Sequence, residues 1–268
     1  MATTTIAIAN QKGGVGKTSI TLGLADVYAQ RGQRVLVIDI DPQANATAGV
    51  GLAEAPPFTI NDVLRGGDDG QVQAGVIAEA AVPAGEGWGG VHIVAGELAL
   101  ANREQDQMVG REFRLRQALA DGTGAWDVVL IDCPPSLGQL TINALVAADA
   151  ALLITEPRAS SVDGLAQIVR TLATVRQHFN PTLRIAGVVV NRHREGLRDR
   201  AEWDATIRAT YPDFYIEPPI PEREIVAVAT SAAAPLSAYA TKARDVLQAL
   251  DVVADKALGR RPRRRAHR

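Results

Sequence analysis

The sequence predicts an α/β fold: a single domain with a doubly wound, mostly parallel β-sheet that is flanked by helices. The first observation is that several short runs are apolar almost throughout, as strands buried on both faces of a parallel sheet are. These runs are residues 4–10, 34–40, 126–133, 150–156 and 184–191. The second observation is that segments with helical spacing alternate with these runs, which is typical of a parallel sheet covered by helices on both faces.

The helical spacing is found in residues 18–31, 138–148, 161–178, 201–210 and 238–258. In the first of these segments Ile20, Leu24 and Val27 lie on one stripe, and Gly32 is suited to end the helix. Right-handed crossovers bring the carboxyl ends of parallel strands to one edge of the sheet, where ligands bind. The middle of the chain, roughly residues 54–90, is richer in Gly and Pro and is expected to form loops around short elements.

The composition favours a soluble cytoplasmic protein with one large domain and a short basic tail. Of the 268 residues, 47% are hydrophobic, which is enough for a sizeable core. No run approaches the roughly 18 apolar residues of a membrane span. Six of the 28 Lys and Arg residues lie near the C-terminus, so we expect a domain over residues 1–258 and a basic, disordered tail over 259–268.

The single cysteine, Cys133, limits the chemistry of the chain. It excludes a disulfide within the chain and supplies too few ligands for a structural zinc or an iron–sulfur cluster. We interpret Cys133 as a small buried hydrophobic residue.

The stretch "NQKGGVGKTS", residues 10–19, predicts a phosphate-binding loop between a strand and a helix. Gly16, Lys17 and Thr18 match the end of the pattern G-x-x-x-x-G-K-[ST], but position 11 is Gln and an extra lysine, Lys12, follows it. Glycines let backbone N–H groups converge on phosphate oxygens, Lys17 would meet the β- and γ-phosphates, and the Thr18 hydroxyl would ligate Mg²⁺. The phosphate-binding residues are then Gly13, Gly14, Val15, Gly16, Lys17, Thr18 and Ser19. The alternative, a glycine-rich turn that holds lysines by chance, does not explain the flanking strand and helix.

Carboxylates follow two other strands of the predicted sheet. Asp39 and Asp41 follow one strand at a spacing of two, which points both to the same side of an extended chain. The alternative is that one of them caps the next helix, with Pro42 as its first residue. Asp132 ends another apolar strand, the usual position for an acid that holds Mg²⁺, directly or through water, opposite a phosphate-loop threonine.

Three segments together resemble the ParA/Soj family of deviant Walker A ATPases. They are "NQKGGVGKTS", "VIDIDPQANATAGVG" and "DVVLIDCPPSLGQLTINAL", and they cover residues 4–145 closely. Residues 220–236, "IPEREIVAVATSAAAPL", resemble the family's segment near the adenine. The resemblance implies a P-loop NTPase type of fold, ATP and Mg²⁺ as cofactors, and slow, partner-stimulated hydrolysis of ATP to ADP and phosphate.

The resemblance also implies a role for the extra lysine. In this family it reaches across a homodimer to the partner's ATP, so that two ATP molecules are sandwiched between the subunits. Here Lys12 takes that role, Lys17 and Thr18 bind phosphate and Mg²⁺, and Asp41 matches the acid that orients the attacking water. Asp39 and Asp132 would lie near the metal and its waters.

Two further positions correspond to the adenine contacts of the family. They are Asn191, at the end of the strand "GVVVN", and the backbone near Pro221. The alternative for Asn191 is a polar residue that only ends its strand in a turn.

An arginine-rich segment indicates binding to nucleic acid. The family binds DNA non-specifically in this part of the chain, and the candidate residues are Arg192, Arg194, Arg198, Arg200 and Arg208. The alternative is a solvated charged loop, because Glu195 and Asp199 are interleaved with the arginines. Both interpretations are kept as expectations.

Two functions remain open. The first is a nucleoid-associated ATPase that partitions plasmid or chromosomal DNA with a ParB-like, centromere-binding adaptor. The alternative is a MinD-like or protein-cargo positioning ATPase that acts at a membrane or on a non-DNA cargo. Membrane binding is not expected, because Asp245, Asp251 and Asp255 on the polar face of the last helix would repel anionic lipid. For a third interpretation, an ATP-dependent ligase, the sequence offers no substrate-pocket motif.

Overall fold

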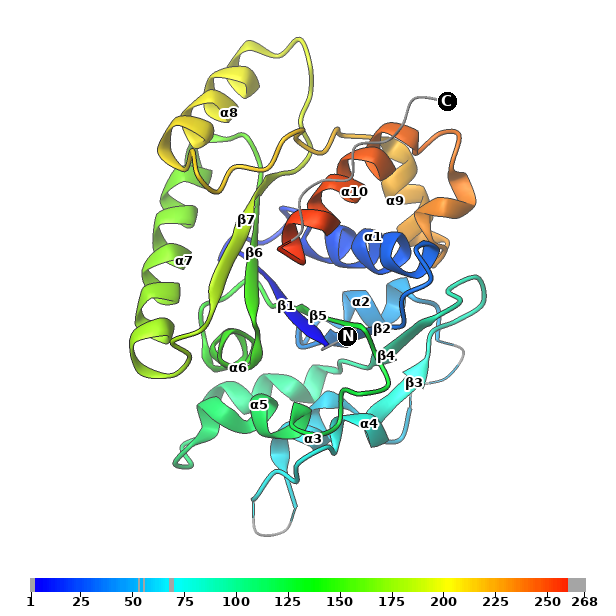
Figure 1. Ribbon diagram of the computed structural model, residues 1–268, viewed down its shortest axis with the longest axis vertical. Helices are drawn as coiled ribbons and strands as arrows, with labels where there is room; N and C mark the ends of the chain where they lie inside the picture. Colours follow the sequence, from blue (N-terminus) through cyan, green and yellow to red (C-terminus); the bar gives the residue numbers. More distant parts are fainter. Residues whose placement is uncertain (1–2, 53, 55, 68–69, 260–268) are drawn as a thin grey trace.

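The computed structural model describes residues 3–52, 54, 56–67 and 70–259. At its centre is a seven-stranded sheet with the strand order β3-β4-β2-β5-β1-β6-β7 (Figure 1). Neighbouring strands are parallel except at one edge, where β3 is antiparallel to β4. The predicted fold class is confirmed. The strands are β1 (Thr4–Ala9), β2 (Val35–Asp39), β3 (Ala81–Pro83), β4 (Val91–Val94), β5 (Val128–Asp132), β6 (Ala150–Thr155) and β7 (Arg184–Val190).

The five predicted strands are all present, and β3 and β4 join them at the edge of the sheet. The sequence pattern does not reveal these two, because β3 has three residues and β4 has four, too few for a periodic signal. The tail predicted for residues 259–268 lies, from residue 260 onward, outside the described residues.

Helices connect the strands in the predicted order. They are α1 (Lys17–Gln30), α2 (Asn45–Gly49), α3 (Ile60–Arg65), α4 (Ile77–Ala80), α5 (Arg114–Leu119), α6 (Gln139–Ala147), α7 (Ala159–His178), α8 (Arg198–Thr210), α9 (Glu224–Ser231) and α10 (Arg244–Ala257). Short 3₁₀ turns are η1 (Leu98–Gln105), η2 (Arg111–Phe113) and η3 (Leu236–Tyr239). In the part of the chain that is described, no helix is long and apolar enough to cross a membrane.

The last helix begins later than predicted. We expected helix from residue 238, but α10 begins at Arg244 and η3 precedes it as a separate turn. The buried carboxylate of Asp26 on α1 accepts hydrogen bonds from the backbone N–H and the hydroxyl of Ser237, both at 2.7 Å. These bonds hold η3 against α1 as a turn separate from α10.

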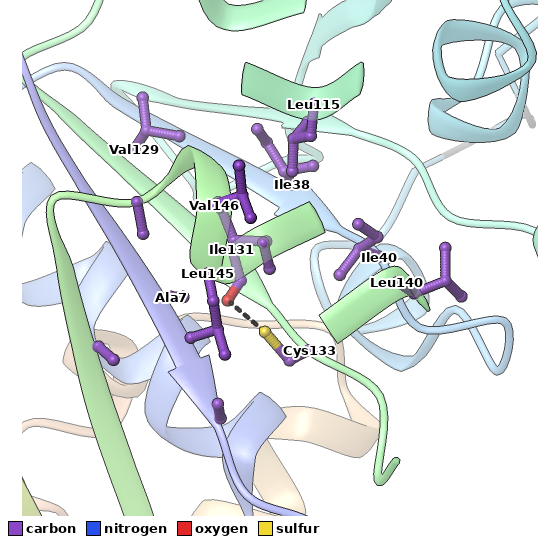
Figure 2. Packing of buried hydrophobic residues seen from close by; sticks show 14 of the residues in the cluster. Ala7, Ile38, Ile40, Leu115, Val129, Ile131, Cys133, Leu140, Leu145 and Val146 are labelled. Carbon is purple, nitrogen blue, oxygen red and sulfur yellow. Dashed lines mark hydrogen bonds between the residues drawn. The ribbon is translucent and has the colours of Figure 1, made fainter. Parts of the chain in front are cut away.

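A hydrophobic core lies on each face of the sheet. One is formed with α1 and α10, and the other with α3, α5, α6 and α7 (Figure 1). Figure 2 shows Cys133 in the second core, with Ile131 and Leu140 among its neighbours. Its thiol lies 3.8 Å from the carbonyl of Ile131, and burial raises the pKa of the thiol. The interpretation of Cys133 as a small buried hydrophobic residue is confirmed.

Ion pairs fasten α10 to α1, which is the helix that follows the phosphate-binding loop. Arg31 at the end of α1 pairs with Asp251 at 2.8 Å and with Asp255 at 3.0 Å. The hydroxyl of Tyr28 donates to the carbonyl of Ala254 at 2.9 Å. The placement of Asp255 on the polar face was therefore wrong: its side chain is 2% exposed and turned toward α1, because Arg31 supplies the opposite charge there.

We expect Asp255→Ala to lower the free energy of unfolding by about 2 kcal/mol, because the partly buried guanidinium of Arg31 would lose a charge-assisted hydrogen bond to one of its two carboxylates. Urea unfolding followed by circular dichroism measures this change. Asp245→Ala is the matched control on the same helix, since Asp245 is half-exposed and pairs with Arg223 at the surface. The control should change stability by less than about 1 kcal/mol, and an equal loss in both variants would contradict a special role for Asp255.

Candidate nucleotide-binding site

Strand register brings the predicted acids and the phosphate-binding loop to one edge of the sheet. In the β2–β5 pair Asp39 lies opposite Asp132, and in the β1–β5 pair Ile8 lies opposite Asp132. β5 therefore lies between β1, which leads into the loop, and β2, which carries Asp39. Residues far apart in the sequence meet here because parallel strands end together.

The loop itself has the backbone that binding of phosphate requires. Gly14 and Gly16 have φ values of 77° and 85°, the left-handed region that favours glycine. A Cβ added to Gly16 would lie 2.3 Å from Nδ2 of Asn191, whereas one added to Gly14 would meet nothing within 4 Å. The first turn of α1 has no side-chain cap, so its N–H groups are available for an anion.

Lys17 and Thr18 lie between the loop and Asp132. Nζ of Lys17 donates to the carbonyl of Lys12 at 3.5 Å. Burial lowers the pKa of Lys17, and the negative charge of Asp132 opposes the shift. The Thr18 hydroxyl donates to Asp132 at 2.6 Å, and the Thr21 hydroxyl donates to the other oxygen of the same carboxylate at 2.8 Å. The sequence did not single out Thr21, although its spacing of three from Thr18 puts the two hydroxyls on one face of α1.

Asp39 and Asp41 occupy different surroundings. Asp39 is buried and accepts hydrogen bonds from the amide of Thr47 at 2.7 Å, the hydroxyl of Thr47 at 2.8 Å and the amide of Asp41 at 3.2 Å. Asp41 accepts from the amide of Gln43 at 3.0 Å. The alternative of a helix cap with Pro42 as the first helical residue is wrong, because α2 begins at Asn45 and its N-cap residue is Ala44. Asp39 nevertheless accepts from an amide in the first turn of α2, that of Thr47. Thr47 is a second contact residue that the sequence did not single out.

The buried carboxylates of Asp39 and Asp132 repel each other. Burial raises the pKa of Asp39, and burial together with the charge of Asp39 raises the pKa of Asp132. Such a pair is relieved by a proton or by a cation. The arrangement is therefore suited to a cation beside the Thr18 hydroxyl.

The two candidate adenine contacts line the same pocket. A cavity of about 450 Å³ is bordered by Ser19, Asn191 and Pro221, together with residues 222–224 and the start of α9. Asn191 donates from Nδ2 to the carbonyl of Val15 at 2.9 Å, which joins the end of β7 to the phosphate-binding loop. Asn191 is thus more than a strand-end turn residue: it contacts the loop and faces a pocket beside it.

The candidate DNA-binding arginines are not gathered into one unpaired patch. Arg194 pairs with Glu222 at 2.7 Å, Arg198 pairs with Glu202 at 3.0 Å, and Arg208 pairs with Glu217 and lies over the ring of Tyr215. Arg200 has a buried guanidinium nitrogen with no hydrogen-bond partner among the described residues. Arg192 donates to the carbonyl of Gly14 in the phosphate-binding loop and pairs with Glu156. The paired acids come from α8 and the segment 217–222, not from Glu195 and Asp199.

Comparisons with known proteins agree with this geometry. A family described as an AAA domain matches residues 3–185. The chromosome partitioning protein ParA of Caulobacter vibrioides is 38% identical over 246 residues, which are 88% of this chain and 87% of that protein.

Two solved structures share the fold over most of their length. Cobyrinic acid a,c-diamide synthase from Mycobacterium smegmatis, with bound ADP and magnesium, has a TM-score of 0.74 and 32% identity, over 86% of this chain and 92% of that one. An ATP complex of McdA from Cyanothece has a TM-score of 0.84 and 25% identity, over 98% of this chain and 99% of that one. The loop, the three acids and these similarities lead to one conclusion: the chain belongs to the ParA/Soj family of deviant Walker A, P-loop ATPases.

Proposed function

We propose that this chain is a nucleotide-timed switch that partitions plasmid or chromosomal DNA. It binds ATP and Mg²⁺, forms a homodimer around two ATP molecules, binds DNA non-specifically as a dimer, and returns to the monomer after slow hydrolysis. A ParB-like adaptor accelerates hydrolysis, and the protein is cytoplasmic and nucleoid-associated. The observation that supports the proposal most strongly is the phosphate-binding loop with two lysines, held beside Asp39, Asp41 and Asp132.

The residues at the site fit ATP and Mg²⁺. Mg²⁺ prefers hydroxyl and carboxylate oxygens, and Thr18 and Asp132 present one of each at 2.6 Å from one another, with Asp39 opposite. Bound Mg²⁺ would neutralise charge on those oxygens. The pocket at Asn191 and Pro221 has a suitable volume for the base.

Lys17 and Lys12 would each stabilise negative charge on phosphate, but on different ATP molecules. Lys17 is buried at the start of α1 and would contact the phosphates of its own nucleotide. Lys12 is separated from it by the glycine turn and would contact the partner's ATP. Charge that develops on the transferring phosphoryl group must be stabilised by cations. If one cation comes from the other subunit, binding of ATP favours the dimer and hydrolysis removes that gain.

Asp41 would orient the attacking water. It follows β2, and its carboxylate accepts from the amide of Gln43, which fixes its rotamer within the loop. Asp39, by contrast, already accepts three hydrogen bonds, two from Thr47 and one from the amide of Asp41. Asp41 is therefore the better placed of the two to accept a hydrogen bond from water.

DNA would contact the arginines of α8 and the loop before it. Arg194, Arg198 and Arg208 are exposed at the surface, and their carboxylate partners are exposed or half-exposed as well. Surface ion pairs of this kind contribute little, so phosphate groups can replace the carboxylates. A dimer doubles the number of such contacts, which ties DNA affinity to ATP.

We expect Lys17→Ala to impair the binding of ATP and Lys12→Ala to impair dimerisation. Lys17→Ala should weaken binding of ATP by about 100-fold, because charge-assisted hydrogen bonds to phosphate are lost. Lys12→Ala should bind ATP normally, remain monomeric and be inactive. A fluorescent ATP analogue measures affinity, and light scattering with a non-hydrolysable analogue measures mass. A Lys12→Ala protein that dimerised normally would remove the role of this lysine across the dimer.

We expect Asp41→Ala to bind ATP and dimerise but to hydrolyse ATP about 100-fold more slowly, the usual loss when a water-orienting acid is removed. Size-exclusion chromatography should then show an ATP-trapped dimer. Phosphate release compares the variant with the wild type. Wild-type turnover in Asp41→Ala would leave this acid with a structural role only.

We expect DNA affinity to depend on ATP, to ignore sequence and to fall steeply with salt. Arg198→Glu with Arg200→Glu should abolish it without preventing dimerisation, because acidic residues are tolerated at the first turn of α8. Filter binding at several salt concentrations, with ATP and with ADP, tests this. Arg34→Glu with Arg65→Glu, at exposed sites elsewhere, is the control of equal charge.

Deletion of residues 260–268 separates the contribution of Arg194, Arg198, Arg200 and Arg208 from that of the C-terminal tail. If these four arginines dominate, the deletion should lower DNA affinity and its salt dependence but leave the effect of ATP intact. Equal affinity of the shortened protein in ATP and ADP would contradict the proposal. Binding to anionic liposomes instead of DNA would favour the alternative of a membrane-associated positioning ATPase.

A further inference from the structure

Arg192 has a conformation that sets it apart from the other arginines near β7. It directly follows Asn191, and its φ of 53° lies in the left-handed region, which an arginine rarely adopts. A strained conformation persists only where surrounding contacts hold it.

The side chain of Arg192 is held by contacts with the phosphate-binding loop and with Glu156. Its Nη1 donates to the carbonyl of Gly14 at 2.7 Å and pairs with Glu156 at 3.0 Å. Asn191 donates to the next carbonyl of the loop, that of Val15, at 2.9 Å. Two consecutive residues at the end of β7 therefore hold two consecutive carbonyls of the loop.

Holding these carbonyls also orients the N–H groups of the loop. In a planar trans peptide the N–H points opposite to the C=O of the same unit. The carbonyl of Gly14 shares its peptide with the N–H of Val15, and the carbonyl of Val15 shares its peptide with the N–H of Gly16. Fixing both carbonyls toward β7 directs both N–H groups away from β7, as a phosphate-binding turn requires.

Glu156 anchors Arg192 from the side of β6. Its side chain is 6% exposed and pairs with Arg158 at 2.8 Å as well as with Arg192. A buried carboxylate between two guanidinium groups has a fixed position, so it limits where Arg192 can move. Arg192 itself is 46% exposed and also borders the pocket at Asn191.

We propose that Arg192, held by Glu156, is a positioning residue that orients the phosphate-binding loop for nucleotide, and that its main role is not contact with DNA. This inference rests on the proposed function, because it requires that the loop binds nucleotide. It assigns Arg192 to the nucleotide site and leaves DNA to Arg194, Arg198, Arg200 and Arg208.

Three variants isolate the side chain of Arg192. Arg192→Gly removes the side chain without a left-handed penalty, and we expect the Kd for a fluorescent ADP analogue to rise about tenfold, since a charge-assisted hydrogen bond to the loop is lost. ADP is used because its affinity depends on the phosphate-binding loop and does not require the protein to dimerise. Arg192→Lys should restore part of the affinity, because one cationic donor can still reach the carbonyl of Gly14. Arg65→Ala, which removes an exposed arginine that pairs with Asp62 on α3, is the control and should bind the analogue as the wild type does.

Steady-state kinetics distinguish positioning from catalysis. Because the loop holds the ground state and the transition state equally, Arg192→Gly should raise KM about tenfold and leave kcat within about twofold. Glu156→Gln distinguishes positioning of the loop from direct attraction of phosphate. If Arg192 attracted the phosphate groups directly, loss of the negative charge of Glu156 would tighten the binding of nucleotide. A positioning role predicts about threefold weaker binding instead, because the anchor is weakened.

Wild-type nucleotide affinity in Arg192→Gly, or tighter binding in Glu156→Gln, would overturn the inference. Loss of DNA binding alone in Arg192→Gly would return this residue to the DNA interface. Failure of the wild type itself to bind nucleotide is a separate result, which would contradict the proposed function before any variant is compared.

Discussion

The hydrogen bonds from Thr18 and Thr21 to the carboxylate of Asp132 fix the start of α1 against the end of β5. The loop before α1 must then turn sharply within a few residues, and only Gly14 and Gly16 adopt the left-handed conformations that the turn needs. On the opposite side Asn191 and Arg192 hold the loop carbonyls. The site therefore depends on a helix start held from two directions, with β5 on one side and β7 on the other.

The same geometry concentrates charge that is not balanced within the site. Asp39 and Asp132 lie opposite each other, and burial raises the pKa of both. Burial lowers the pKa of Lys17. Each of these shifts disfavours the charged form of its group, and a polyanion bound with a cation would reverse them. Such a site gains more free energy when it binds nucleotide and cation than a site whose charges were already balanced. This suits a protein whose state is set by nucleotide.

Much of the fold and of the site could be predicted from the sequence, because the information is local. The strand–loop–helix at residues 4–31 carries its own glycines, lysines and apolar stripe, and the acids at the ends of β2 and β5 directly follow apolar runs in the sequence. What could not be predicted depends on partners distant in the sequence. Asp255 is buried because Arg31 meets it, and Thr47 reaches Asp39 only after α2 folds back. The interleaved acids Glu195 and Asp199 gave no indication that Glu222, Glu202 and Glu217 would pair with the arginines.

We propose that nucleotide at this loop controls the association of two chains. Multi-angle light scattering of the wild-type protein in Mg²⁺, with ATP and with ADP, measures this association as a mass. We expect a monomer of 28.4 kDa in ADP and twice that mass in ATP. The same mass with both nucleotides, at protein concentrations where both are bound, would contradict it.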